Sequence, residues 1–404
     1  MNRKSKTLAV IWFSVLAVAP VTAWAANTPP SAASSSPVQL LAKGNNTFAV
    51  RLYRKLATST GNVFFSPFSV SAALGMAFTG ARNDTARQIK KALDFQLASP
   101  GLNRAFKSAS DEMTAMAQKE GAKLNIANGL SLRQGGIDKQ FTATLKNFYG
   151  AELFSGGLEQ INAWVRQKTR GRIDRIIDRL GPSSACVILD AIYFKGLWEK
   201  PFSKESTRQA PFHLSSTKQV RVPFMYRRAG FQMLNGKDFQ ALSIPYAGGG
   251  FSMIVFLPKT IEGLAALENR LSAEKLDHWL DEVARQPVRQ IDLYLPEFTM
   301  ESSYDLKSYL RELGMKKAFG KDADFSAIKT PRGALWIAGI KHKGFLKVNE
   351  QGTEAAAATA VTMRALAMRR YPLFRADHPF LFVIRDNQNS MLLFMGRQAD
   401  PESK

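Results

Sequence analysis

The stretch that decides the fold reads Glu350-Gln351-Gly352-Thr353-Glu354-Ala355-Ala356-Ala357-Ala358-Thr359-Ala360-Val361. Its alanines favour helix by intrinsic propensity, and a surface helix capped by a threonine is one interpretation. The residues just before it alternate instead as in a strand, with apolar residues such as Ile340 and Leu346 on one face and lysines on the other. Small side chains fit a narrow slot between packed strands, so the stretch is predicted to be able to enter a sheet.

This stretch resembles the hinge of the reactive loop of inhibitory serpins, whose pattern is Glu-x-Gly-Thr-x-Ala-Ala-Ala-Ala-Thr. The residues that match the pattern are Glu350, Gly352, Thr353, Ala355, Ala356, Ala357, Ala358 and Thr359. Gln351 departs from it mildly, because the family often has a charged residue there. Non-inhibitory serpins tend to carry large, charged or proline residues in this part, and this chain does not.

Three further blocks resemble the same family in the same order along the chain. They are residues 62–70, residues 189–202 and the C-terminal pair 377–386 with 393–397. Together with the hinge they extend over nearly the whole chain after the first forty residues. The resemblance implies an α+β fold with three β-sheets, about nine helices and an exposed reactive loop, as in a bacterial, secreted, inhibitory serpin.

Hydrophobic periodicity and turn residues predict the other elements. Helices are expected over residues 45–57, 67–81, 85–93, 102–120, 141–149, 161–180 and 304–313. Strands are expected over residues 62–66, 124–132, 185–189, 239–245, 251–257, 291–298 and 340–348. The helix over 161–180 resembles the serpin helix that lies across the face of the main sheet.

The N-terminal segment has the pattern of a cleaved secretory signal over residues 1–25, with a basic start, an apolar centre and a small-x-small end. Its apolar run is shorter than the roughly 20 residues of a membrane-spanning helix. Residues 26–39 are rich in proline, serine and alanine and are predicted to be a flexible linker, and 40–404 a single domain. The expected location is periplasmic or extracellular.

The chain has 404 residues and a formal charge of +22, which attracts polyanions such as heparin-like glycans or nucleic acids. Six basic residues crowd one predicted helix: Arg166, Lys168, Arg170, Arg172, Arg175 and Arg179. Asp174 and Asp178 lie among them and Trp164 is the only aromatic residue there, so a solvated helix face is the better interpretation. A polyanion stays open as a second partner.

The sequence offers no plausible enzyme site. Its four histidines form no His-Glu-x-x-His motif, and its single cysteine, Cys186, allows no Cys-x-x-Cys pair and no internal disulfide. Cys186 lies in a β-like run and is expected to be a buried, inert thiol. Gly248-Gly249-Gly250 is predicted to be a hairpin turn rather than a phosphate loop. Neither a metal nor a cofactor is predicted.

The resemblance implies a suicide-substrate inhibitor of serine proteases that acts as a monomer and forms a covalent complex with its target. Counting from Glu350 at the family's spacing puts the bait bond at Leu366-Ala367, with Arg364 and Met368 as rivals. A leucine suits elastase-, chymotrypsin- or subtilisin-like proteases, whereas Arg364 would suit a trypsin-like one. The alternatives are a non-inhibitory carrier or chaperone on the same scaffold and a cross-class inhibitor of cysteine proteases.

The resemblance also implies a polar cluster where the main sheet opens. The matching residues are Ser66, Ser69, Asp190, Trp198 and His342. Asp190 replaces an asparagine that the family bonds to the histidine aligned with His342. One hypothesis is that Asp190 only accepts the same hydrogen bonds, and the other is a buried carboxylate–imidazolium pair.

Overall fold

Helix starts follow local capping chemistry in the computed structural model, which describes residues 35–58, 60–132, 138–155, 157–179, 186–328, 335–353 and 370–403. Ser36 caps the first helix, because its hydroxyl accepts from the Gln39 N–H while the Gln39 side chain accepts from the Ser36 N–H. The helices of these residues are α1 (Pro37–Leu56), α2 (Pro67–Gly80), α3 (Asn83–Ala92), α4 (Ser99–Lys119), α5 (Lys139–Tyr149), α6 (Leu158–Lys168), α7 (Leu264–Arg270), α8 (Ala273–Arg285) and α9 (Lys307–Glu312). Short 3₁₀ turns are η1 (Lys204–Ser206), η2 (Lys317–Phe319) and η3 (Ser326–Ile328).

A six-stranded sheet carries the stretch that precedes the hinge. Its order is β10 (Phe298–Asp305), β11 (Ile337–Asn349), β12 (Gly352–Thr353), β4 (Cys186–Leu197), β2 (Lys123–Ser131) and β3 (Glu152–Phe154). β11 also pairs directly with β4, in parallel, over residues 337–345 of β11, and β12 enters between the two strands beyond this region. The burial of β11 alternates as its sequence predicts, since the lysines lie on one face and Ile340, His342, Leu346 and Val348 are buried on the other.

The remaining strands form a second network of nine. The path is β1 (Val63–Phe65), β15 (Leu392–Gln398), β14 (Phe380–Asp386), β8 (Phe251–Pro258), β7 (Phe239–Pro245), β6 (Gln219–Asn235), β9 (Val288–Pro296) and β13 (Leu373–Arg375), with β5 (Arg208–His213) beside β6. The 17-residue strand β6 pairs with β5, β9 and β7 in succession. β6 thereby joins strands that would otherwise form two separate sheets. The α+β fold therefore has two hydrogen-bonded sheets, one of nine strands and one of six, where three sheets were predicted.

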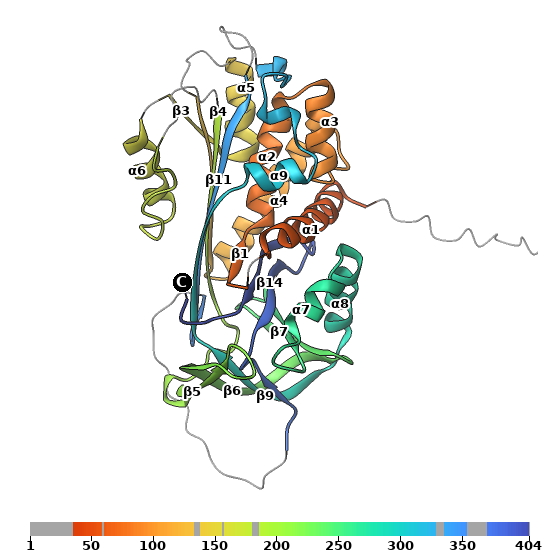
Figure 1. The fold of residues 1–404 in the computed structure, drawn as a ribbon, viewed down its shortest axis with the longest axis vertical. Helices are drawn as coiled ribbons and strands as arrows, with labels where there is room; N and C mark the ends of the chain where they lie inside the picture. Colours follow the sequence, from red (N-terminus) through yellow and green to blue (C-terminus); the bar gives the residue numbers. More distant parts are fainter. Residues whose placement is uncertain are drawn as a thin grey trace, which may run out of the picture. The chain divides into compact units, whose positions relative to one another are not determined.

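Helices cover both faces of the six-stranded sheet (Figure 1). On one side α6 packs over a small apolar cluster that includes Ile161, Leu189 and Phe345. On the other side α2 contacts both β4 and β15, and it is buried along nearly its whole length. α2 therefore lies in the main hydrophobic core, directly behind the strands that pair around β12.

Two predicted helices differ from the observed ones. α1 begins at Pro37, eight residues before the predicted start, because Ser36 supplies a capping box. α6 ends at Lys168 instead of continuing to residue 180, since Arg170 and Gly171 adopt left-handed backbone angles, with φ of 54° and 76°. No helix in the described ranges is long and apolar enough to cross a membrane.

Candidate functional site

Two residues of the hinge, Gly352 and Thr353, form strand β12 at the end of the six-stranded sheet where β11 finishes. Thr353 pairs with Val348 of β11 on one side and with Gly196 of β4 on the other, antiparallel to both. The Thr353 side chain is fully buried, and its hydroxyl lies 2.8 Å from the Tyr246 hydroxyl. Gly352 has a φ of 150°, and a Cβ atom there would overlap the carbonyl oxygen of Gly196, so only glycine fits.

Trp198 fixes the turn that leads from β11 into β12. Its indole Nε1 donates to the carbonyl oxygen of Asn349 at 2.9 Å, and its backbone N–H donates to that of Gln351 at 2.8 Å. The Phe202 N–H donates to the carbonyl oxygen of Glu350 at 2.7 Å. The indole also stacks on the Tyr246 ring at a centroid distance of 4.6 Å, so the base of the loop is attached to a rigid aromatic pair.

Four of the five residues predicted for the opening region meet in the middle of the sheet. Asp190 and His342 lie opposite each other on β4 and β11, and His342 Nδ1 is 2.7 Å from Asp190 Oδ2. The Ser69 hydroxyl donates to the other carboxylate oxygen of Asp190. The Ser66 N–H donates to His342 Nε2 at 3.1 Å, and the Ser66 hydroxyl accepts from the Ser69 N–H and caps α2.

Trp198 does not belong to this cluster. It follows β4 eight residues after Asp190, which at about 3.3 Å per residue is about 25 Å along the strand. The predicted opening region is therefore two sites: a polar cluster at the centre of the sheet, and the Trp198 attachment at the end where β12 enters. The sequence block that contains both residues gave no signal of this separation, because one long strand connects them.

The hydrogen bonds of His342 bear on the two hypotheses for Asp190. Nε2 faces a backbone N–H and must present its lone pair, so the ring carries its proton on Nδ1 and donates it to Asp190. An imidazolium would need a second N–H where the Ser66 N–H already points. This geometry favours Asp190 as an acceptor of hydrogen bonds in the position where the family has asparagine, and the carboxylate–imidazolium pair stays a prediction.

The remaining predicted hinge residues and the bait lie outside the described residues. These are Ala355, Ala356, Ala357, Ala358 and Thr359 of the hinge, and Arg364, Leu366, Ala367 and Met368 at the bait. Among the described hinge residues, Glu350, Gly352 and Thr353 lie together at the end of β11 and in β12. Their roles in inhibition stay predictions.

One member of the site was missed by sequence reasoning. Glu297 lies between β9 and β10, and burial, followed by the influence of Glu350, raises its pKa to about 7. The sequence predicted one strand over residues 291–298, whereas the pairing changes at this residue. Glu297 precedes Phe298, which pairs with Val348, so the alignment of β10 beside β11 places it near the end of β11.

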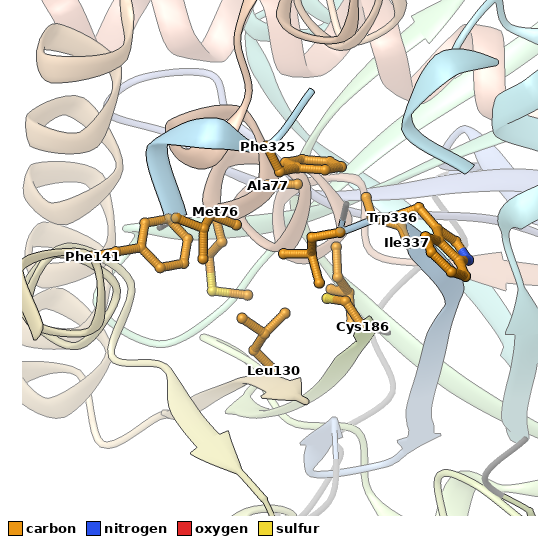
Figure 2. Close-up of a pocket in the computed structure, with 11 residues that line it drawn as sticks. Met76, Ala77, Leu130, Phe141, Cys186, Phe325, Trp336 and Ile337 are labelled. Atoms are coloured by element: carbon orange, nitrogen blue, oxygen red, sulfur yellow. The ribbon is translucent and has the colours of Figure 1, made fainter. Parts of the chain in front are cut away.

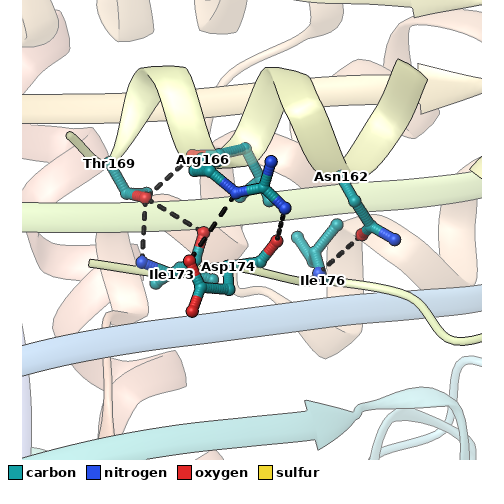
Figure 3. A network of polar contacts seen from close by, with 7 residues as sticks. Asn162, Arg166, Thr169, Ile173, Asp174 and Ile176 are labelled. Carbon is teal, nitrogen blue, oxygen red and sulfur yellow. Dashed lines mark hydrogen bonds and ion pairs between the residues drawn. The ribbon is translucent and has the colours of Figure 1, made fainter. Parts of the chain in front are cut away.

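The basic segment after α6 folds back on the helix rather than extending it (Figure 3). Asn162 Oδ1 accepts from the Ile176 N–H at 2.9 Å, and Arg166 contacts the Asp174 carboxylate at 3.6 Å. The Arg175 guanidinium contacts an acid in the same segment, and Lys168 contacts Glu152 on β3. These ion pairs weaken the attraction of the segment for a polyanion. Binding of a polyanion stays a prediction.

An apolar cavity lies at the opposite end of β4 and β11 (Figure 2). It is lined by Met76, Ala77, Leu130, Phe141, Cys186, Ile188, Phe325, Ile328, Leu335, Trp336 and Ile337. Burial raises the pKa of the Cys186 thiol to about 12, so the thiol stays protonated at neutral pH and is a poor nucleophile. No group of metal-ligating side chains occurs in the described part of the chain.

Comparison with known proteins identifies the family. The family model described as Serpin (serine protease inhibitor) matches residues 43–401. Leukocyte elastase inhibitor of Equus caballus is 37% identical and covers 90% of this chain and 100% of its own length. Serpin B3 of Homo sapiens is 36% identical over 89% of this chain and 99% of its own. The crystal structure of human thyroxine-binding globulin has a TM-score of 0.82 at 27% identity, over 91% of this chain and 100% of that one.

These relatives contradict the predicted export through a signal peptide. Leukocyte elastase inhibitor is matched over 100% of its length by 90% of this chain, and the family model begins at residue 43. The relatives are therefore complete without a counterpart to the predicted signal, and the predicted periplasmic or extracellular location is corrected. The bacterial origin stays a prediction. From the family model and the relatives together, the chain belongs to the serpin family.

Proposed function

We propose that this serpin is a suicide-substrate inhibitor of serine proteases, which traps its target by inserting the cleaved reactive loop into the six-stranded sheet. The observation that carries the proposal is strand β12, because the hinge residues Gly352 and Thr353 already pair with both β4 and β11. Relatives named as elastase inhibitors support the inhibitory class. The chain would act as a monomeric single domain over 40–404 and as an inhibitor rather than an enzyme.

The reaction begins with an ordinary proteolytic attack. The protease serine attacks the carbonyl carbon of the bait residue, for which we propose Leu366 before Ala367. The peptide bond breaks, the new amine leaves and the bait residue stays bound to the enzyme as an ester. The cut releases the hinge from the C-terminal part of the loop, so the hinge is free to enter the sheet.

The register of β12 predicts how far insertion would proceed. Cys186 lies ten residues before Gly196 on β4, so residue 363, ten after Thr353, would reach the start of that strand. On β11 the same distance includes one irregular residue near Ile337. The bait carboxyl would then lie just beyond the far end of the sheet, with the protease attached to it.

The same register predicts what happens at the polar cluster. Asp190 lies six residues before Gly196, and His342 lies six before Val348. Residue 359, six after Thr353, would therefore enter between Asp190 and His342 and separate them. Thr359 carries a hydroxyl that can both donate and accept, so it could replace the hydrogen bonds that this separation breaks.

Insertion exchanges a parallel pair of strands for two antiparallel ones. β4 and β11 pair in parallel from residue 186 to 193 of β4 before insertion. An inserted strand would be antiparallel to both, as β12 is, and antiparallel pairing is slightly more stable per residue. The uncut chain would therefore be trapped kinetically in a less stable state. A protease carried to the far end loses its catalytic geometry and cannot release the ester.

A non-inhibitory carrier role is the second candidate, because thyroxine-binding globulin shares the fold. The fold alone does not separate the two functions. The small residues of the hinge favour inhibition, since a strand entering between packed neighbours must avoid bulky and charged side chains.

Denaturing electrophoresis tests the proposal. The chain is incubated with elastase-, chymotrypsin-, trypsin- and subtilisin-like serine proteases and with a cysteine protease. A band that survives SDS and has the summed mass of chain and serine protease is the expected result. Cleavage of the chain by every protease without such a band would contradict it, and a stable complex with the cysteine protease alone would favour the cross-class alternative.

A further inference from the structure

Three lysines form a row across the end of the six-stranded sheet where β12 enters. Lys123 of β2 lies directly opposite Lys195 of β4 in their antiparallel pair. Lys195 and Lys347 follow Tyr193 and Phe345 by two residues on β4 and β11, so their side chains lie on the face that carries the α6 cluster. Lys195 is half-buried, and Lys123 and Lys347 are exposed. These three residues are called the lysine row below.

The lysine row lacks the acid that its geometry favours. Like charges directly opposite each other on paired strands destabilise a sheet, and opposite charges stabilise it. Two other lysines nearby have such acids, since Lys341 contacts Asp305 at 2.8 Å and Lys168 contacts Glu152 at 2.7 Å. Within the part of the chain that the structure describes, no acid lies within ion-pair distance of a lysine of the row. The row therefore presents uncompensated positive charge where the loop would enter.

The register of β12 assigns one hinge residue to the space between two of these lysines. Thr353 is paired with β4 on one side and with β11 on the other. A strand that continues antiparallel to both puts its next residue, Glu354, opposite Lys195 and Lys347 and on their face of the sheet. Side chains in such opposite positions have Cβ atoms about 5 Å apart, which a lysine and a glutamate can easily span. Glu354 is also the only charged residue in 353–363.

We propose that the lysine row is a docking site for the Glu354 carboxylate, which it binds in the first step of loop insertion. The carboxylate would accept hydrogen bonds from Lys195 on one side and Lys347 on the other, and Lys123 adds a third positive charge beside Lys195. The attraction acts early, because residue 354 is the next to enter the sheet after Thr353. This inference rests on the loop insertion proposed above and names the residues that begin it.

A soluble polyanion is the other ligand that a row of lysines can attract. The arrangement favours the chain's own carboxylate, because Lys195 and Lys347 flank the position that residue 354 would occupy. The hinge has an acid at that one position and no charge in the nine residues after it. The charge of the loop therefore matches the position of the row.

A double-mutant cycle on the loop-cleaved chain tests the docking site. The chains are the parent, Glu354→Gln, Lys195→Gln and the double variant, each intact and cleaved in the loop by a metalloprotease, which forms no ester. Cleavage should raise the unfolding midpoint of each single variant by about 1 to 3 °C less than that of the parent. The double variant should lose no more than a single one. Losses that add would overturn the proposal, because independent residues add. Lys347→Gln replaces Lys195→Gln if that variant does not fold.

Lys343→Gln is the matched control, because Lys343 lies on the same face of β11 and the register puts Ala358 opposite it. Its cleaved chain should gain as much as the parent. Raising the salt from about 50 mM to about 1 M should reduce the difference between the parent and Glu354→Gln, since salt screens exposed charges. A difference that salt leaves unchanged would show that Glu354 acts by packing and would overturn the proposal.

Charge reversal tests the same site in the reaction with a serine protease. Glu354→Lys should lower the ratio of SDS-stable complex to cleaved chain by about 1.5- to 5-fold for each lost pair. Adding Lys347→Glu should restore part of the ratio, and adding Lys343→Glu should restore less. Equal rescue by both would overturn a site that depends on position.

The outcomes separate this inference from the proposed function. If no protease forms a complex, but cleavage stabilises the chain and the cycle shows coupling between Glu354 and Lys195, the inhibitory function fails while the docking site stands. If complexes form and the two residues act additively, the docking site fails alone. Loss of heparin binding in Lys195→Gln, without any coupling to Glu354, would assign the lysine row to a polyanion instead and overturn the proposal.

Discussion

At the scale of single residues, Asp190 shows how one substitution is accommodated in a buried polar cluster. Its two carboxylate oxygens take the Ser69 hydroxyl and the His342 Nδ1–H, and the Ser66 N–H fixes the ring from the other side. Every donor that faces Asp190 is thereby used. An acid therefore fits where the resemblance leads one to expect an amide, because the neighbours supply only donors.

The first prediction concerns this cluster. Asp190→Ala should lower the free energy of unfolding by about 3 kcal/mol, because it leaves the Ser69 hydroxyl and the His342 N–H buried without an acceptor. Asp190→Asn keeps one acceptor oxygen and should cost about 1 kcal/mol. Denaturant unfolding of both variants measures the difference. Equal costs would mean that the hydrogen bonds of Asp190 do not stabilise the closed sheet.

At the scale of elements, most predicted strands and helices agree with the structure to within a few residues at each end. The alternation of apolar and basic residues along β11 identified its buried face. A strand with one apolar face packs that face against the core, whichever strands are its neighbours. The helix over 161–180 was predicted too long, because Asn162 and Arg166 hold a folded-back segment that has the same apolar spacing as a helix. Contacts of this kind depend on how distant residues meet, and no local pattern reports them.

The candidate site, too, could be predicted from the sequence only in part. The hinge motif, Asp190 and His342 could be found from short sequence blocks. The separation of Trp198 from Asp190, the hydrogen bond from the Ser66 N–H to His342 and the position of Glu297 near the end of β11 could not. Each of these depends on the register between β4, β10 and β11, which a single sequence leaves open.

A second prediction belongs to the strand β12. Thr353→Arg should convert the inhibitor into a substrate, because a charged side chain would have to occupy the buried position beside Tyr246 without a partner. Insertion slows while hydrolysis of the ester does not. The measurement is the ratio of SDS-stable complex to cleaved chain. Thr353→Ser keeps the hydroxyl and is the control, and an unchanged ratio for the arginine variant would contradict the role of β12.

At the scale of the whole molecule, inhibition depends on a competition between two rates. The loop must enter a sheet whose β4 and β11 are already paired, and it must do so before the ester is hydrolysed. The bait residue chooses the protease, and the hinge decides the outcome. These two functions lie in different parts of one loop, so they should respond to mutation independently.

A third prediction tests that independence. Leu366→Arg should move inhibition from elastase- or chymotrypsin-like proteases to trypsin-like ones, because the bait residue fills the specificity pocket. The fraction of attacks that ends in a complex should change little. Mass spectrometry of the released C-terminal fragment gives the cleaved bond directly. A fragment that begins after Arg364 or Met368 would show that the bait bond is at one of the rival positions.

The central claim is that cleavage lets the loop become a strand of the six-stranded sheet, and thermal unfolding of the intact and the loop-cleaved chain tests it most directly. About ten inserted residues would bond to both β4 and β11, in exchange for the parallel bonds that now join those two strands. At about 1 kcal/mol for each bond, less the cost of ordering the strand, the unfolding midpoint should rise by roughly 10 °C or more on cleavage. A midpoint that is unchanged or lower after cleavage would contradict insertion and with it the proposed mechanism.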